Sequence, residues 1–61
     1  MIDYTDKIFE FKDVIGQIVT AKFVEMYNGE KEEFIKVKET KFGFIFLLRP
    51  SEQDIKWKII S

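Results

Sequence analysis

The stretch Phe42-Gly-Phe-Ile-Phe-Leu-Leu48 decides the expected fold, because it is an unbroken run of uncharged and mostly bulky residues. Side chains along a strand alternate between two faces. The stretch therefore places Gly43, Ile45 and Leu47 on one face and its remaining, larger residues on the other. Both faces are apolar, which is typical of a strand that lies centrally in a sheet or is covered on both sides. The run is far too short to span a membrane.

Two alternating segments flank this run, and together they predict a three-stranded meander over residues 34–40, 41–49 and 54–60, with 41–49 in the middle. Apolar residues alternate with lysines in both flanking segments, which is the pattern of half-buried strands. A polar loop that begins at Arg49-Pro50 separates the last two strands. The predicted core lies on one face of the meander: Ile35, Val37, Phe42, Phe44, Phe46, Leu48, Ile55, Trp57 and Ile59.

Residues 14–27 fit two interpretations. They are rich in β-branched side chains, which favour strands, and we predict a strand over residues 17–26. The alternative is an α+β fold in which 14–27 is a helix, because Ile15, Val19 and Phe23 also share one helical face. In either case Asn28-Gly29 marks a chain reversal, since both residues accept the backbone angles of tight turns.

At the N-terminal end, the spacing of Tyr4, Ile8, Phe11 and Ile15 is that of a helical stripe, and we predict a short helix or turn within residues 1–13. A short edge strand over 8–11 is the rival interpretation. The whole chain, residues 1–61, is then one small, mainly β domain, an antiparallel meander of about four strands. Its short lead-in, Ile15-Gly16-Gln17-Ile18-Val19 and the meander resemble the layout of Sm-like and other SH3-like small barrels, and this resemblance implies a curled barrel. No RNA-binding motif of those families stands at the matching places.

The composition excludes several kinds of chemistry. The chain has no Cys and no His, so disulfides, ordinary zinc sites and histidine-based acid–base catalysis are excluded. Its three glycines stand apart at 16, 29 and 43, so no phosphate-binding glycine loop is present. The acidic clusters at Asp3/Asp6 and Glu30/Glu32/Glu33 fall in segments expected to be exposed. We therefore predict a protein that is not an enzyme and has no cofactor, metal or small-molecule substrate.

The charge is divided unevenly along the chain although the net charge is only −1. Residues 1–33 carry eight acids and four bases, a net charge of −4, and residues 34–61 carry three acids and six bases, a net charge of +3. We expect the two halves to pair with each other in the fold or between subunits; a functional dipole is the alternative. No secretory signal or lipid anchor is evident, and the lack of Cys fits a cytoplasmic location.

The second face of the meander is the candidate binding surface. In the predicted arrangement, Ile45 and Leu47 form an apolar stripe on the central strand with lysine-bearing strands on both sides. Three interpretations compete: a covered face, a protein interface, and a site for single-stranded nucleic acid. The candidate partner-binding residues are Phe34, Lys36, Lys38, Ile45, Leu47, Lys56, Lys58 and Ile60.

The predicted function is therefore a small non-enzymatic protein-binding module that acts through a sheet face or an edge strand. By analogy it is an accessory or inhibitor protein of the kind that phages encode. A chain this short buries only about 60% of its unfolded surface, so we expect a homodimer or another protein as partner. The alternative function is a small-barrel protein that binds single-stranded nucleic acid; no membrane partner is expected.

Overall fold

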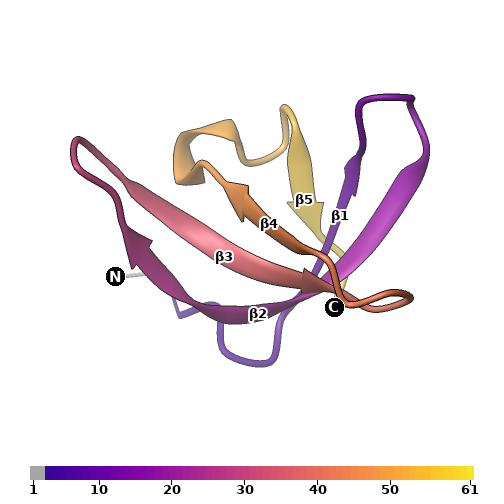
Figure 1. Ribbon diagram of the computed structural model, residues 1–61, viewed down its shortest axis with the longest axis horizontal. Helices are drawn as coiled ribbons and strands as arrows, with labels where there is room; N and C mark the ends of the chain where they lie inside the picture. The colour runs from indigo at the N-terminus through magenta and orange to yellow at the C-terminus, as the bar shows by residue number, and fades with distance from the viewer. Residues whose placement is uncertain (1–2) are drawn as a thin grey trace.

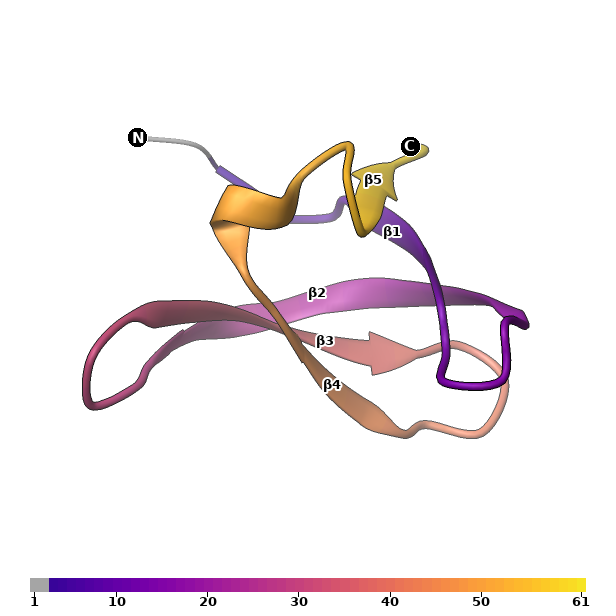
Figure 2. The ribbon, with the colours of Figure 1, turned by 90° about the horizontal axis from the view of Figure 1, so that it is seen from above.

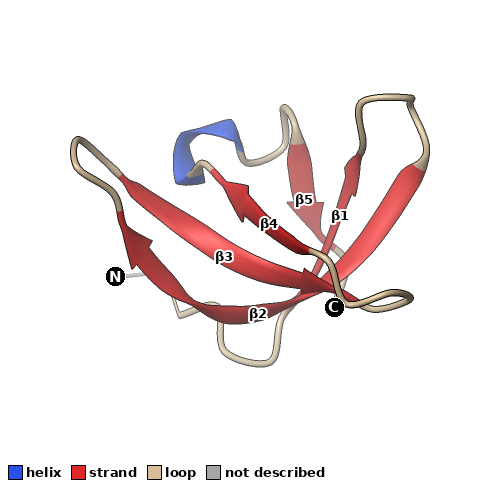
Figure 3. Ribbon diagram, in the orientation of Figure 1, coloured by secondary structure: helices blue, strands red, loops and turns tan. Residues whose placement is uncertain are grey.

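The computed structural model describes residues 3–61, which form one antiparallel five-stranded sheet (Figure 1). The order across the sheet is β4-β3-β2-β1-β5. The mainly β fold predicted from the sequence is confirmed, and Figure 3 shows strands joined by loops and by one short helical turn. The elements are β1 (Ile8–Lys12), β2 (Ile18–Asn28), β3 (Glu33–Glu39), β4 (Ile45–Leu48), the 3₁₀ turn η1 (Pro50–Glu52) and β5 (Trp57–Ile59).

The long strand β2 organises the sheet. Its first half pairs with β1 and its second half with β3, and the register with β3 shifts between Phe23 and Glu25. Such a bulge bends the strand and increases its twist. The predicted strand over residues 17–26 is thus confirmed and the helical alternative over 14–27 is wrong. The bent sheet carries β4 to one side and β1 with β5 to the other (Figure 2).

The edges of the sheet lie elsewhere than predicted. The β3–β4 hairpin forms, but β5 pairs with β1 and not with β4, so residues 41–49 supply an edge strand rather than the middle of a meander. Alternation predicts which face of a strand is buried and says nothing about its partner, so the distant pairing of β1 with β5 had no local signal. Because β4 and β5 do not pair, the sheet is bent but is not closed into the curled barrel that the resemblance implied.

Over residues 3–13 the chain forms the predicted turn but no helix. A turn at Thr5–Asp6 is closed by the N–H of Lys7, which donates to the carbonyl oxygen of Tyr4 at 3.0 Å. The rival strand then begins at Ile8, because only an extended chain lets Phe9 and Phe11 both face the core. The reversal after Asn28 is confirmed as a loop over residues 29–32.

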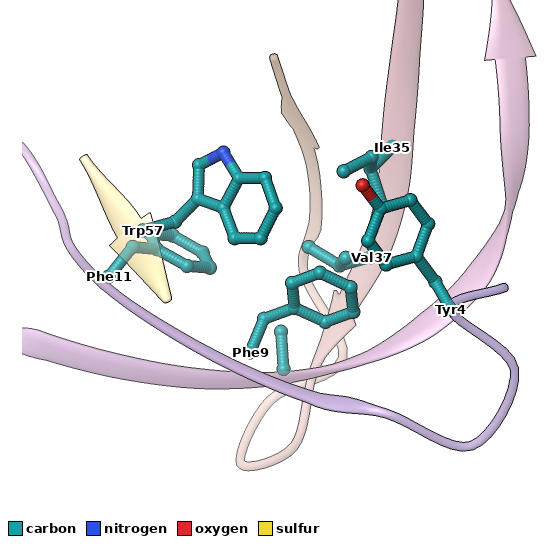
Figure 4. Packing of buried hydrophobic residues seen from close by; sticks show 7 residues of the cluster. Tyr4, Phe9, Phe11, Ile35, Val37 and Trp57 are labelled. Atoms are coloured by element: carbon teal, nitrogen blue, oxygen red, sulfur yellow. The ribbon is translucent and has the colours of Figure 1, made fainter. Parts of the chain in front are cut away.

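The core is mainly aromatic and lies inside the curl of the sheet. Figure 4 shows Phe9 at its centre, with Trp57 on one side and Tyr4 on the other; the ring centroids lie 5.3 Å and 5.7 Å from that of Phe9. Phe11 packs edge-on against Phe46 at 5.0 Å. The buried residues are Tyr4, Phe9, Phe11, Ala21, Ile35, Val37 and Trp57.

The predicted core is partly correct. Ile35, Val37 and Trp57 are buried, and Phe46, Leu48 and Ile59 are half-buried against the core. The assignment of Phe42, Phe44 and Ile55 to the core is wrong, because all three are exposed. All three residues lie before their strands begin, β4 at Ile45 and β5 at Trp57. Gly43 has a φ of 81° and Asp54 a φ of 63°, and such left-handed backbone keeps the preceding segments from being extended.

The three ion pairs among residues 3–61 each join an acid of the first half to a base of the second half, as expected from the uneven charge. They are Glu25–Lys36 at 3.2 Å, Glu32–Arg49 at 3.4 Å and Glu10–Lys58 at 3.4 Å. Exposed pairs of this kind contribute at most about 1 kcal/mol each. They therefore help to set the register of neighbouring segments more than they stabilise the fold.

Replacing Trp57 by phenylalanine should lower the free energy of unfolding by roughly 1–3 kcal/mol. The indole Nε1 donates to the carbonyl oxygen of Arg49 at 2.7 Å, and this bond ties β5 to the segment that leaves β4. Phenylalanine keeps much of the packing but leaves that carbonyl without its donor. Urea unfolding followed by circular dichroism measures the loss. Tyr27→Phe, at an exposed ring, is the matched control and should change little; equal losses in the two variants would contradict a structural role for the bond.

Candidate functional site

Exposed apolar side chains gather in two places. The first, called the β4 edge below, comprises Phe42, Phe44, Ile45 and Leu47, whose exposed fractions are 70%, 62%, 53% and 46%. The second is a groove between the β1–β2 loop and the turn before β5. Contiguous exposed apolar area usually marks a place where a protein binds a partner, so both are candidates for a functional site.

The backbone of β4 presents unpaired groups beside these side chains. The N–H of Glu39 donates to the carbonyl oxygen of Phe44 at 2.7 Å, which fixes the hydrogen-bonding phase of the β3–β4 ladder. Bonded and non-bonded positions alternate in an antiparallel pair. Phe46 and Leu48 therefore direct their N–H and C=O groups toward β3. The corresponding groups of Ile45 and Leu47 point away from the sheet, on the side where no described strand lies.

The β3–β4 turn holds the two exposed rings in place. The carboxylate of Glu39 accepts the N–H of Lys41 at 2.8 Å and that of Phe42 at 2.6 Å. The rings of Phe42 and Phe44 then lie 6.0 Å apart, and the Nζ of Lys41 lies 5.3 Å from the centre of the Phe42 ring. The turn thus presents its aromatic side chains to solvent from an ordered backbone.

Acidification should loosen this turn. Desolvation raises the pKa of Glu39, but the N–H groups of Phe42 and Lys41 outweigh it, so the pKa lies below its ordinary value of 4.5. A carboxyl with a depressed pKa contributes stability that is complete above 4.5 and is lost as the pH falls through the folded value. Glu39→Gln should lose this dependence, so the difference in urea midpoint between the two proteins should shrink on acidification. Titration of the Glu39 carboxyl by NMR with a midpoint at or above 4.5 would contradict this account.

Five of the predicted site residues lie on β4 and the neighbouring strand β3. Leu47 is opposite Lys36 and Ile45 is opposite Lys38 in the β3–β4 register. Lys36 is held by Glu25 and lies 5.6 Å above the ring of Tyr27, whereas Lys38 is exposed. The fifth, half-buried residue is Phe34, whose ring lies 6.3 Å from that of Tyr27.

The other three predicted site residues do not join this group. Lys56, Lys58 and Ile60 belong to the β5 side, and β3, β2 and β1 separate them from β4. Lys58 is paired with Glu10 on β1. The prediction that lysine-bearing strands flank Ile45 and Leu47 on both sides is therefore wrong, because β4 has a neighbour on one side only.

The groove beside β5 is lined by both apolar and charged residues. It has a volume of about 680 Å³, and the apolar residues that line it are Phe11, Ile18, Leu48, Ile55 and Trp57. Acids and lysines alternate around it, and two of the acids are already engaged: Glu10 by Lys58, and Asp13 by the N–H groups of Ile15 and Gln17 at 3.0 Å and 2.9 Å. The groove thus has the size of a ligand pocket without a charge pattern that selects one class of ligand.

Residues that the sequence analysis missed are the exposed rings of Phe42 and Phe44. The signal for them was Gly43, since a glycine inside an apparent strand often marks a bend. The sequence pattern does not indicate which backbone groups of β4 point toward β3 and which point outward. Their direction depends on which residues of β3 and β4 face each other, and only the structure supplies that register.

Within residues 3–61 there is no cluster of acidic side chains arranged to hold a metal ion, and no helix long and apolar enough to cross a membrane. Comparison of the chain with protein-family models, with curated proteins and with solved structures gave no significant match. A proposal about function therefore rests on the surface described above.

Proposed function

We propose that this chain is a small non-enzymatic protein-binding module that takes an extended segment of a partner protein along β4. The partner segment would form hydrogen bonds with the outward N–H and C=O groups of Ile45 and Leu47. Its side chains would pack against those of the same two residues. Strand addition of this kind takes affinity from the backbone and selectivity from alternate side chains.

The observation that carries the proposal is the lack of protection at β4. Exposed sheet edges are normally blunted by charges, by proline, by bulges or by extreme shortness. The other edge follows that rule, since β5 has three residues and Lys58 at its centre. The strand residues of β4 carry no charge and expose apolar side chains, and Arg49 and Pro50 come only after the strand has ended. An edge left open in this way supports a role in pairing.

The proposed site is narrower than the one expected from the sequence. It keeps Lys36 and Lys38 on β3 as the flank of Ile45 and Leu47, with Phe34 near the start of the same strand, and it adds the rings of the β3–β4 turn. We include a cytoplasmic location in the proposal, because a chain without Cys needs no oxidising compartment. An accessory or inhibitory role, such as phage proteins of this size have, is proposed by analogy.

Selection of short random peptides displayed on phage tests the proposal. Peptides that bind the wild-type protein should be extended sequences rich in β-branched residues, and they should fail to bind Leu47→Pro. Proline at this position removes an outward N–H, where an edge strand tolerates it. Ile55→Ala removes an exposed apolar side chain at the groove and is the control. Peptides that bind Leu47→Pro as well as the wild type would place the binding site elsewhere.

Binding of single-stranded nucleic acid is the second candidate, and one observation favours it. Phe42 and Phe44 are exposed beside Lys38 and Lys41, and stacked bases with neighbouring phosphates use that combination. The net charge of −1 opposes it. Fluorescence anisotropy with a labelled oligothymidylate separates the two candidate functions. A protein that binds nucleic acid would bind the oligonucleotide, and its affinity would fall steeply with added salt. The protein-binding proposal expects no binding of the oligonucleotide near 0.15 M salt, about the physiological value.

A further inference from the structure

We infer that a second copy of this chain pairs with the β4 edge, antiparallel to it, about a two-fold axis that passes beside Phe46. This inference rests on the proposed function and names a partner for the same edge. The two five-stranded sheets would then form one continuous sheet across the axis. A two-fold interface needs a surface that complements itself, and β4 has that property in its backbone and in its side chains.

The hydrogen-bonding phase of β4 limits how two copies can pair. Only Ile45 and Leu47 of β4 present outward N–H and C=O groups, so a second β4 must place its own Ile45 and Leu47 opposite them. With the axis beside Phe46, Ile45 faces Leu47 of the second copy and Leu47 faces its Ile45. Each facing pair exchanges two bonds in an antiparallel ladder, so this register makes about four backbone hydrogen bonds from strand residues alone.

Two other registers also place outward-facing backbone groups opposite each other, but each of them has a conflict. An axis beside Ile45 puts Leu47 opposite Gly43 of the second copy, which lies in the turn with a φ of 81° and is not extended. An axis beside Leu47 puts Ile45 opposite Arg49, whose carbonyl oxygen already accepts the Trp57 indole N–H. That axis also places a charged side chain against an apolar one. The register about Phe46 avoids both conflicts.

The same register covers the exposed side chains. On the outer face, Ile45 of one copy lies beside Leu47 of the other. On the inner face, Phe46 meets its own counterpart, and the exposed ring of Phe44 comes opposite Leu48, which is half-buried in the monomer. The run 44–48 then gains apolar neighbours on both faces of the joined sheet, in keeping with the alternation of apolar residues that is typical of a central strand.

Charge does not prevent the association. The nearest lysines on the outer face would be Lys36 of one copy and Lys38 of the other, three strand spacings or roughly 14 Å apart. This exceeds the screening length of about 8 Å at physiological salt, and Glu25 already neutralises Lys36. The remaining repulsion is between like charges, so added salt should strengthen the dimer slightly. Nucleic-acid binding has the opposite salt dependence.

The area available indicates a weak dimer. Phe44, Ile45 and Leu47 expose about half of their surface. At roughly 200 Å² for each large side chain, they remove about 300 Å² per copy from water. With the strand backbone and Phe42 included, the total reaches about 1,000 Å², the lower limit for a specific interface. Interfaces at this lower limit are typical of weak, transient association, so we expect a dissociation constant in the micromolar range.

Sedimentation equilibrium of the full chain tests the inference. The wild-type protein should change from a mass of 7.3 kDa to twice that value between about 1 and 1,000 µM, the range that brackets micromolar dissociation constants. Leu47→Pro should remain a monomer at every concentration, with an unchanged circular dichroism spectrum. Leu47→Ala keeps the N–H and loses the side chain on both sides of the axis, so it should dimerise about 30-fold more weakly. Ile55→Ala is the control and should match the wild type.

A wild-type protein that stays monomeric over this range would overturn the inference. The proposed function would survive that result if displayed peptides still require the Leu47 N–H, and it would fail separately if they do not. Masses above the dimer would indicate head-to-tail pairing of unlike edges and overturn the two-fold arrangement. Weakening by Ile55→Ala with no effect of Leu47→Ala would move the interface to the groove and overturn the inference.

Disulfide trapping tests the register directly, because the chain has no Cys of its own. Facing residues of a bonded antiparallel pair have Cα atoms about 5.5 Å apart, within the range a disulfide spans. Ile45→Cys mixed with Leu47→Cys should cross-link rapidly, and each variant alone should not. Rapid cross-linking of Ile45→Cys with itself, or of Leu47→Cys with itself, would contradict the axis beside Phe46 and indicate one of the two poorer registers.

Discussion

Replacing Phe9 by alanine should unfold the protein at room temperature. Phe9 is fully buried, and its ring lies between those of Tyr4 and Trp57. Loss of a core phenylalanine typically costs about 3–5 kcal/mol, from lost transfer free energy and from the cavity left behind. A single core in a chain of this size supplies roughly 3–5 kcal/mol in total. The variant should therefore lose its cooperative urea transition, measured by circular dichroism.

The matched control is Phe42→Ala, which removes the same side chain from an exposed position. Surface substitutions of this kind change stability by roughly 0.5 kcal/mol or less, so its urea midpoint should stay close to that of the wild type. The comparison separates the observed core from the core expected from the sequence, which included Phe42. A Phe42→Ala variant as unstable as Phe9→Ala would contradict the structure.

The sequence predicts the strands better than it predicts their neighbours. The segments over 17–26, 34–40 and 54–60 each overlap a strand of the sheet, because alternation and β-branched residues reflect local backbone geometry. The burial of Ile35, Val37 and Trp57 follows from the same alternation. These features depend on residues near each other in the chain, and a single sequence contains that information.

The edges depend on distant contacts. β1 is a strand because it pairs with both β2 and β5. The apolar residues in and around it are also spaced as on one face of a helix, so the sequence favoured a short helix or turn there. The run 42–48 looks like a central strand because it is apolar on both faces. A strand that is covered only when a partner binds has the same pattern as one covered by its own sheet. Local pattern therefore could not distinguish an interior position from an interface.

Phe46→Pro should detach β4 from the sheet. The N–H of Phe46 points toward Val37 in the β3–β4 ladder, and Val37 is fully buried. Proline removes that donor and leaves a buried carbonyl oxygen without a partner, at a cost of roughly 1–3 kcal/mol. It also removes the Phe46 ring from its contact with Phe11. The combined loss is comparable with the stability of the whole domain, so the urea midpoint should fall sharply or the transition disappear.

Leu47→Pro is the matched variant one residue further along. Its N–H points outward, so the β3–β4 ladder keeps all its bonds, and proline is tolerated at such edge positions. We expect its urea midpoint to stay much closer to that of the wild type than the midpoint of Phe46→Pro. Equal destabilisation by the two prolines, or a greater loss at Leu47, would mean that the hydrogen-bonding phase of β4 is the reverse of the one described.

Amide hydrogen exchange along β4 is the most direct test that this open edge is where the protein binds. In dilute protein, the amides of Phe46 and Leu48 should exchange slowly, because β3 holds them, and those of Ile45 and Leu47 should exchange rapidly. Raising the protein concentration, or adding a peptide selected on the wild type, should slow Ile45 and Leu47 selectively. Rapid exchange that persists at Ile45 and Leu47 while the mass doubles or the peptide saturates would contradict the account.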